Sequence, residues 1–498
     1  MSAAPTASTA PAALPPEHRR LITLLVVSAF VVILNETIMS VALPELMQDL
    51  DIPATTAQWL TTGFLLTMAV VIPITGFLLQ RFEIRQVFIA AMTAFTIGTL
   101  IAATAPGFAV LLVGRIVQAI GTALMMPLLM TTVMSLVPEV RRGQVMSVIS
   151  IVISVAPAIG PTISGVVLEV LDWRWMFWLV LPCAVLSLAV GARWVQNVTA
   201  PQGAHLDVLS VVLSAIAFSG VVYGLSSIGE AAQGHTPIPP AIPIAVGVVT
   251  LALFVRRQLS LGDRALLDLR VFSSPLFCVA ALLAGLTMMT LLGALIVLPI
   301  YLQDVLDAST LTTGLILLPG GLVMGLLAPF VGRAYDRVGP RPLVLPASLV
   351  VIVAMVLLAM VGESTAKGFV IAAHVVLSIG LALMFTPLLT TALGAVPPQR
   401  YSHGSAIVST AQQVAGAAGA AVFITIMTRG ATAASDDGAG DVQALAEGVQ
   451  HAMLAGVVLA VLCAIVAFFL RRPAPPQPPA DGPGAPAPDG ALTAVAAD

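Results

Sequence analysis

The sequence predicts an all-α integral membrane protein with fourteen transmembrane helices, and three observations support this prediction. Of 498 residues, 58% are hydrophobic and only 9% are charged, with a mean hydropathy of +1.03. A soluble domain carries about 25% charged residues. Apolar runs that approach the roughly 20 residues needed to cross a bilayer recur along the chain. Finally, basic residues fall in alternate connections between these runs.

The apolar runs define fourteen expected spans, each bounded by polar or turn-forming residues. The shortest is the eighth, at 240–255. The spans cover approximately residues 21–44, 57–79, 86–105, 107–135, 144–169, 175–195, 207–228, 240–255, 276–301, 310–331, 342–361, 368–394, 403–427 and 449–470.

The distribution of basic residues sets the expected orientation. With the N-terminus inside, 17 of the 21 lysines and arginines lie on the cytoplasmic side, and only Arg174, Lys367 and Arg429 lie outside. Cytoplasmic loops of membrane proteins carry such an excess of positive charge. A missed or added helix would disturb this alternation, so we expect both termini in the cytoplasm of a multi-pass protein in a bacterial cytoplasmic membrane.

Two similar loops indicate two related halves. GFLLQRFEIRQ (76–86) follows the second span, and GRAYDRVGPRP (332–342) follows the tenth. Helices 1–6 and 9–14 are therefore expected to form two six-helix repeats with two helices inserted between them, an established transporter architecture. The expected parts are a disordered tail (1–20), a first bundle (21–195), the inserted helices with their links (196–275), a second bundle (276–470) and a disordered Pro/Ala-rich tail (471–498).

Glu36 is the only carboxylate that the sequence places well inside a span. A charge at membrane depth costs roughly 2.5–3.5 kcal/mol on insertion scales and marks an ion or substrate path. At 1.5 Å per residue, Glu36 and Arg115 of the fourth span both fall in the outer half of the bilayer, roughly a few ångströms apart in depth. The pair predicts proton coupling; a structural lock between the two helices, or no contact, are the alternatives.

Six segments resemble the major facilitator superfamily, and in particular its fourteen-helix drug–proton antiporter group. They occur in the expected order over about residues 20–470: TIMSVALP (37–44), GRIVQAIGTAL (114–124), APAIGPTISG (156–165), WRWMFWLVLP (173–182), LDVLS (206–210) and GRAYDRVGPR (332–341). The resemblance implies alternating access driven by a proton gradient, without a cofactor. It also implies an acid at the position of Asn35 and a small residue at that of Glu36, so in this chain the acid is displaced by one position.

Polar and thioether side chains mark the expected substrate cavity. Gln118, Thr122, Met125 and Met126 continue from Arg115 along one helix, and soft thioethers suit variable ligands. Further candidates are the pair Gln412–Gln413 and His374. The alternatives are ordinary packing for the methionines, interhelical hydrogen bonding for the glutamines and a neutral core position for the histidine.

The segment ISVAPAIGPTISG resembles the antiporter motif in the fifth helix. Its expected functional residues are Pro157, Gly160, Pro161 and Gly165. The resemblance implies a seal against proton leak. Close helix packing through glycine and a proline-broken hydrogen-bond ladder explain the composition equally well.

The two similar loops are expected to form a cytoplasmic gate, in which Asp336 and nearby arginines make a charge network across helix ends. The first loop has Gln80 and Glu83 where the family has Asp and Gly, so its latch is expected to be weaker or differently connected. The alternative is that these charges only set topology. The gate residues are Gly76, Arg81, Arg85, Gly332, Asp336, Arg337, Gly339 and Arg341.

Several functions are excluded by missing motifs. The single lysine, Lys367, lies in TAKGF, so the chain has no G-x-x-x-x-G-K-[ST] loop for nucleotide phosphates, and it has no H-E-x-x-H zinc motif. Three cysteines in apolar runs offer no disulfide or metal framework. We expect no enzymatic activity, metal, cofactor, nucleotide or nucleic-acid partner.

The sequence therefore predicts a monomeric, proton-coupled exporter of hydrophobic or cationic small molecules. Its other partners are protons and the lipid bilayer. An exporter dedicated to one endogenous metabolite or antibiotic is the first alternative, and a transport-inactive sensor or scaffold on the same fold is the second.

Overall fold

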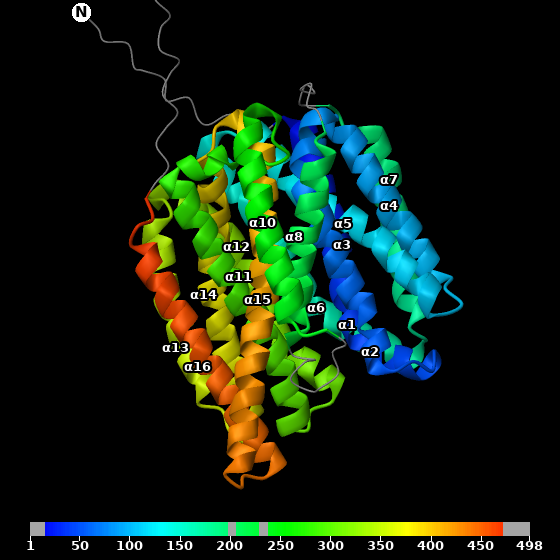
Figure 1. Ribbon diagram of the computed structural model, residues 1–498. Helices are drawn as coiled ribbons and strands as arrows, with labels where there is room; N and C mark the ends of the chain where they lie inside the picture. Colours follow the sequence, from blue (N-terminus) through cyan, green and yellow to red (C-terminus); the bar gives the residue numbers. More distant parts are fainter. Residues whose placement is uncertain (1–14, 198–205, 229–237, 472–498) are drawn as a thin grey trace, which may run out of the picture.

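Fourteen helices in the described part of the chain are long and apolar enough to cross a membrane, as the sequence predicts. The computed structural model describes residues 15–197, 206–228 and 238–471 (Figure 1). The long helices are α1 (Pro16–Asp49), α3 (Trp59–Arg81), α4 (Ile84–Ala103), α5 (Phe108–Leu136), α6 (Arg142–Val170), α7 (Arg174–Trp194), α8 (Val208–Ser226), α10 (Ala241–Leu261), α11 (Pro275–Ile300), α12 (Thr310–Val338), α13 (Arg341–Ala359), α14 (Lys367–Gly394), α15 (Tyr401–Asp436) and α16 (Asp441–Ala467).

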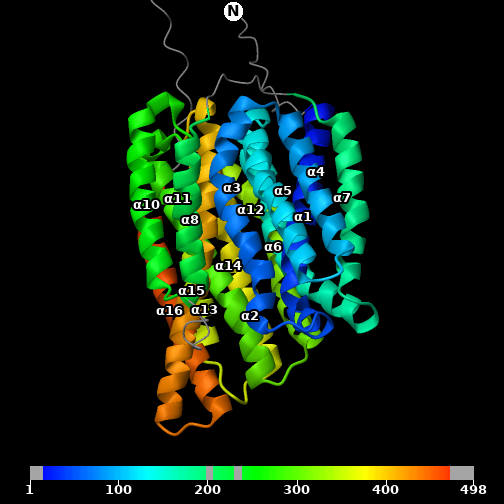
Figure 2. The same cartoon turned by 45° about the vertical axis from the view of Figure 1, so that its right-hand side comes forward.

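The long helices pack as two groups of six with an inserted pair. Helices α1 and α3–α7 contact one another and form the first bundle, and α11–α16 form the second bundle. Between the bundles, α6 packs along α12 and α3 packs along α15. The inserted helices α8 and α10 pack on each other, and α8 also contacts α3 and α15 (Figure 2). The inserted pair therefore covers the outside of the α3–α15 seam.

Helices α1 and α10 have boundaries that differ from those expected. Helix α1 begins at Pro16 rather than near residue 21, because proline is suited to a first helical turn and Glu17 is favourable there. The rest of the expected N-terminal tail, and nearly all of the C-terminal tail, lie outside the described residues. Helix α10 continues to Leu261 instead of ending near 255, because its last turns carry arginine and glutamine that apolar-run counting excludes.

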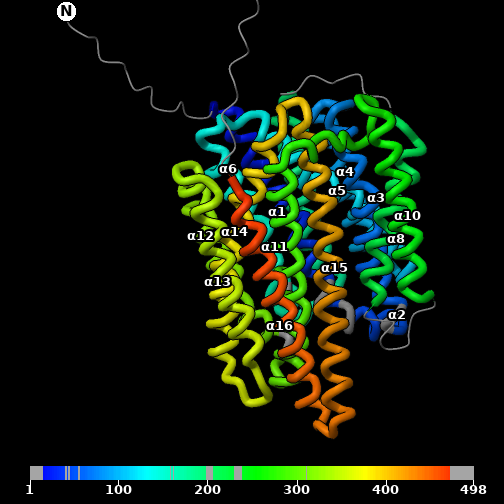
Figure 3. The backbone as a smooth tube through the Cα atoms, turned by 60° about the vertical axis from the view of Figure 1, so that its left-hand side comes forward, coloured from blue at the N-terminus to red at the C-terminus, as the bar shows by residue number. Residues whose placement is uncertain are grey.

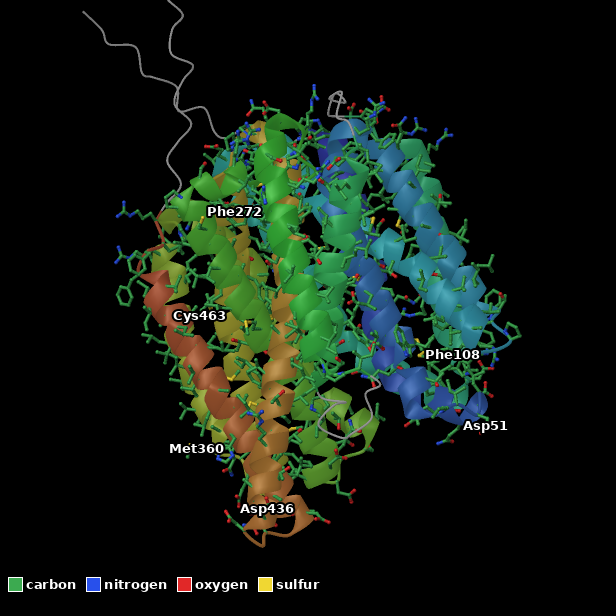
Figure 4. The ribbon with its side chains drawn as sticks, in the orientation of Figure 1. Asp51, Phe108, Phe272, Met360, Asp436 and Cys463 are labelled. Carbon is green, nitrogen blue, oxygen red and sulfur yellow. The ribbon has the colours of Figure 1, made fainter. Side chains whose placement is uncertain are left out.

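The helices α15 and α16 project beyond the rest of the bundle as a hairpin whose tip contains Asp436 (Figures 3 and 4). Helix α15 reaches Asp436 and α16 already begins at Asp441, so both are longer than the expected spans 403–427 and 449–470. The additional turns are polar but rich in alanine, the strongest helix former. They lie at the end of the bundle opposite the one where α1 begins. We call the end where α1 begins the arginine-rich end.

Candidate functional site

A cavity of about 270 Å³ lies between the two bundles. Helices α1, α3, α5, α6, α8, α11 and α15 all contribute to its wall. Six residues singled out in the sequence line it: Glu36, Thr122, Met126, Pro157, Gln412 and Gln413. The remaining wall is aliphatic, with Leu291, Leu292 and Leu295 of α11 facing Leu65 and Met68 of α3. A mainly apolar cavity with a few convergent polar groups is typical of a small-molecule site.

Among the described residues, Glu36 is the one acidic residue in the cavity wall. No described residue donates a hydrogen bond to its carboxylate, and none forms an ion pair with it within 4.0 Å. Thr37, the next residue of α1, also lines the cavity. The carboxylate is therefore available to a proton or to a positively charged ligand.

Arg115 lies behind the cavity wall and is 1% exposed. Its Nη1 atom donates to Asn35 Oδ1 at 3.3 Å and to Gln118 Oε1 at 3.1 Å, and its guanidinium carbon lies 4.2 Å from the centre of the Phe64 ring. Gln118 in turn donates to Thr99 Oγ1 at 2.8 Å. The cation is thus held by neutral groups and a ring face, which attracts cations. In this conformation it makes no ion pair with Glu36 among the described residues.

The displaced acid of α1 has a structural consequence. Asn35 is 2% exposed and turns toward Arg115, whereas Glu36 turns toward the cavity. Adjacent helix positions point about 100° apart. An acid at position 35 would meet the arginine directly; here the amide takes that place and the carboxylate faces the ligand space.

The polar and methionine side chains predicted along α5 lie on different faces of the helix. Thr122 and Met126 line the cavity, while Gln118 belongs to the hydrogen-bond network around Arg115. Met125 is 1% exposed and belongs to the packed core, so for this residue the packing alternative is the one observed. Gln412 and Gln413 place two amides of the second bundle in the same cavity as Glu36.

His374 lies beside the main cavity rather than in it. It lines a smaller cavity of about 40 Å³ together with Ser378, and this cavity shares Ile153, Pro157, Leu291 and Leu295 with the main one. Its Nδ1 atom has no hydrogen-bond partner among the described residues. The histidine is therefore adjacent to the ligand space but separated from Glu36 by the aliphatic wall.

The glycines of the motif in α6 differ in their surroundings. A Cβ atom added at Gly160 would lie 2.2 Å from Oγ1 of Thr37, whereas one added at Gly165 would meet Leu311 at an ordinary 3.9 Å. Pro157 faces the cavity, and the side chain of Pro161 lies outside the described set. Gly160 therefore sets how closely α6 approaches α1 beside Glu36.

This difference predicts the effect of a single added methyl group. Gly160→Ala is expected to displace α1 at Thr37 and to reduce transport at least about tenfold, since displacements of about 1 Å at a site have large effects. The matched variant Gly165→Ala should retain near-normal transport. Comparing the two initial rates at equal expression checks the prediction, and equal rates would contradict it.

The two bundles are joined at the arginine-rich end. Asp336, at the end of α12, accepts hydrogen bonds from the backbone N–H groups of Gly143 and Gln144 at 2.8 and 3.0 Å. These amides begin α6, where the helix dipole favours a carboxylate. Between α5 and α15, the Thr131 and Ser405 hydroxyls lie 2.7 Å apart. The expected latch acid thus bonds across the bundles to a helix N-terminus.

The glycines of the two similar loops lie at equivalent bundle contacts. A Cβ atom at Gly332 would lie 2.3 Å from the carbonyl oxygen of Gly143 on α6. One at Gly76 would lie 3.2 Å from Nδ1 of His403 on α15. Each loop's first glycine therefore permits close approach of the opposite bundle, in agreement with the repeat predicted from the two loops.

The other expected gate residues are not gathered into one network by the described contacts. Arg85 donates to the Ala192 carbonyl at 2.6 Å, inside the first bundle. Gly339 ends α12 with a positive φ of 82°. Arg333, three residues before Asp336, donates to the Pro329 carbonyl at 3.2 Å. No hydrogen bond or ion pair is observed for Arg81, Arg337 or Arg341 in the described part of the chain.

A second ionic cluster at this end was not predicted. Asp268, in the connection between α10 and α11, pairs with Arg270 at 2.8 Å and with Arg400, before α15, at 2.9 Å. Burial by itself would raise the pKa of Asp268, but the hydrogen bonds from Arg270 and the positive charges of Arg400 and Arg270 outweigh it and hold the pKa below its usual value. The connection is thereby fixed to the second bundle in its ionised form.

Val222 of α8 was also missed by the sequence analysis. It lines the main cavity, so the inserted pair contributes directly to the ligand space. A lone valine in an apolar helix carries no signal in a single sequence.

The two inserted helices are joined by an ionic contact. Asp207, directly before α8, accepts a hydrogen bond at its Oδ2 atom from Nε of Arg257 on α10, at 2.6 Å. Hydrogen bonding from Arg257 lowers the pKa of Asp207.

In the described part of the chain, no three His, Cys, Asp or Glu side chains lie together in a way that could hold a metal ion. The three cysteines are unpaired and lie on α7, α11 and α16. The cavity itself offers one carboxylate, two amides and hydroxyl groups. This donor set can exchange a proton and bind a polar or cationic molecule.

Comparison with known proteins gives one family. A family model described as Major Facilitator Superfamily matches residues 25–420. The chain is 41% identical over 450 residues to a protein named lincomycin resistance protein LmrB from Listeria monocytogenes, covering 89% of this chain and 95% of that protein. It is 28% identical over 397 residues to a multidrug resistance protein B homolog from Mycobacterium tuberculosis, covering 79% and 73%.

Among solved structures, the proton:xylose symporter XylE has a similar fold. Its TM-score is 0.62 at 15% sequence identity, and the match covers 91% of this chain and 95% of that one. At this identity the likeness establishes the fold alone.

Proposed function

The chain belongs to the major facilitator superfamily, and from this we propose that it exports hydrophobic or cationic drugs in exchange for protons. It is a multi-pass membrane transporter rather than an enzyme. Relatives named for lincomycin and multidrug resistance support drugs as the substrate class. The observation that carries the exchange mechanism is the Glu36 carboxylate in the cavity wall, which has no hydrogen-bond or ion-pair partner among the described residues.

The proposed mechanism uses one carboxylate for two cations in turn. When the cavity is open to the outside, Glu36 takes up a proton, which neutralises the group and releases a bound cationic drug. The bundles then rock, the proton leaves to the cytoplasm, and the freed carboxylate binds the next drug molecule. Exchange of one proton for one monocationic drug moves no net charge, so the pH gradient drives this cycle and the membrane potential adds nothing to it. The proton gradient thus supplies the energy for transport, and the cycle uses no cofactor.

Arg115 has a supporting role in this proposal. It is fixed by Asn35, Gln118 and Phe64 and does not neutralise Glu36 by direct pairing. A nearby positive charge favours the ionised carboxylate, and burial favours the protonated one. Movement of α1 relative to α5 changes this balance, which couples proton affinity to conformation.

We place the arginine-rich end in the cytoplasm, following the excess of basic residues in its loops. The contacts of Asp336 with the start of α6 then form the closed cytoplasmic gate. The cycle requires these contacts to break when the drug enters from the cytoplasm.

Transport into inverted membrane vesicles with an acidic interior tests the proposal. We expect wild-type protein to accumulate radiolabelled lincomycin, to release protons from the lumen as it does so, and to stop when a protonophore collapses the gradient. A panel of chemically varied drugs separates a multidrug exporter from one dedicated to a single compound. If no compound of the panel is taken up with linked proton movement, the proposal is wrong.

A further inference from the structure

We propose that the cavity selects saturated ammonium compounds, whose N–H groups can bond to Glu36, over aromatic cations with delocalised charge. This inference rests on the proposed function and specifies its substrate class. It is carried by the composition of the cavity wall.

The cavity wall contains no aromatic side chain among the described residues. The chain has 27 Phe, Trp and Tyr residues in total, and none of them falls in the undescribed ranges. A flat aromatic cation gains specific affinity by stacking on rings or by lying against a ring face. This wall can offer such a ligand only aliphatic contact.

Aromatic side chains on the cavity-lining helices are used elsewhere. Phe64 precedes the cavity residue Leu65, but its ring lies under the Arg115 guanidinium. Phe423 lies beyond Ala420 on α15, yet its ring packs where glycines at 293 and 456 leave room for it. These two rings pack against other parts of the protein and do not line the cavity.

The charged and hydrogen-bonding groups fit a compact, protonated amine. Glu36 provides a localised negative charge, and Gln412 and Gln413 provide amide oxygens and N–H groups from the opposite bundle. An ammonium N–H donates a charge-assisted hydrogen bond to a carboxylate, which is about twice as strong as a neutral one. A quaternary or phosphonium cation has no such donor. The aliphatic side chains then cover a saturated body of the ligand.

Three monocationic probes separate the effect of the N–H donor from that of aromatic rings: adamantan-1-ylamine, its N,N,N-trimethyl derivative and tetraphenylphosphonium. We expect purified wild-type protein to bind adamantan-1-ylamine at least about tenfold more tightly than either of the other two, because each lacks the N–H donor. Proton-linked vesicle uptake should follow the same order. Equal or tighter binding of tetraphenylphosphonium by wild-type protein would overturn the inference.

A ring introduced into the wall provides an independent check. Val222→Phe adds an aromatic side chain from α8 and should raise the affinity for tetraphenylphosphonium several-fold relative to that for adamantan-1-ylamine. Val246→Phe on α10, where the valine is 49% exposed and does not line the cavity, is the matched control and should leave the ratio unchanged. If Val222→Phe does not fold, the wild-type order of the probes decides alone.

The outcomes distinguish this inference from the proposed function. Proton-linked uptake of all three probes at similar rates would leave the exporter intact and refute the selectivity. Failure of every probe and of lincomycin to move with protons would refute both.

Discussion

Replacing Glu36 with glutamine is expected to abolish proton-driven export while leaving the fold intact. The amide has nearly the shape of the acid but cannot release a proton. It also loses the charge-assisted bond to a cationic drug, so drug affinity should fall about tenfold or more, since such bonds contribute about 1.5–3 kcal/mol. Initial rates of vesicle uptake measure the first effect and equilibrium binding the second.

Thermal stability distinguishes this account from a structural lock. Glu36 makes no hydrogen bond or ion pair with a described residue, and charges at membrane depth are unfavourable by roughly 2.5–3.5 kcal/mol. Glu36→Gln should therefore keep or raise the Tm. If Glu36 held α1 against α5, its replacement would lower the Tm. Glu45→Gln on the exposed part of α1 is the matched control and should transport normally.

Replacing Gly332 with alanine is expected to reduce transport strongly by preventing closure of the arginine-rich end. The added Cβ atom would lie 2.3 Å from the Gly143 carbonyl oxygen, a backbone atom that cannot rotate away. The added methyl group would therefore hold α12 and α6 further apart. This separation would also lengthen the hydrogen bonds between Asp336 and the start of α6. We expect transport to fall at least about tenfold, because bundle interfaces close by tight packing rather than by continuous deformation.

Thiol labelling reports the closure directly. In protein without the three native cysteines, Ala406→Cys introduces a thiol at a position that is 0% exposed in the closed end. A membrane-impermeant reagent supplied from the arginine-rich end should label it several-fold faster in the Gly332→Ala background. Gly368→Ala is the control, because an added Cβ there meets nothing within 4 Å. Equal labelling rates in all three backgrounds would show that Gly332 does not control closure.

The helix count was predictable because burial in lipid requires long apolar runs, and the sequence displays them directly. The ends of α10, α15 and α16 were not predictable by the same criterion. Their terminal turns are polar yet helical, stabilised by helix propensity and by neighbouring helices, so apolar-run counting ends too early.

The candidate site was predictable in part for a similar reason. Glu36 and the glutamine pair stand out because polar groups are rare in apolar helices, and they do line one cavity. The rotation of α1 that directs Asn35 toward Arg115 and Glu36 toward the cavity depends on how α1 packs against α5. The sequence of a single helix does not determine this packing. Val222 became visible only when the inserted pair was placed over the α3–α15 seam.

The contacts that join the two bundles at the arginine-rich end could also not be predicted without the tertiary structure. The sequence indicates that Asp336 lies among arginines, but across the interface it also accepts hydrogen bonds from backbone amides of α6. Backbone N–H groups at a helix start are invisible to charge patterning. The contacts of His403 with Gly76 and of Arg400 with Asp268 each join segments more than 100 residues apart.

The central claim is that one carboxylate binds the proton and the drug in turn. It is tested most directly by adding lincomycin to purified protein in weakly buffered solution and recording proton release. We expect wild-type protein to release about one proton per drug molecule bound at a pH where Glu36 is protonated, and Glu36→Gln to release none. Undiminished proton release from Glu36→Gln, or drug binding by wild-type protein without release at any pH, would contradict the account.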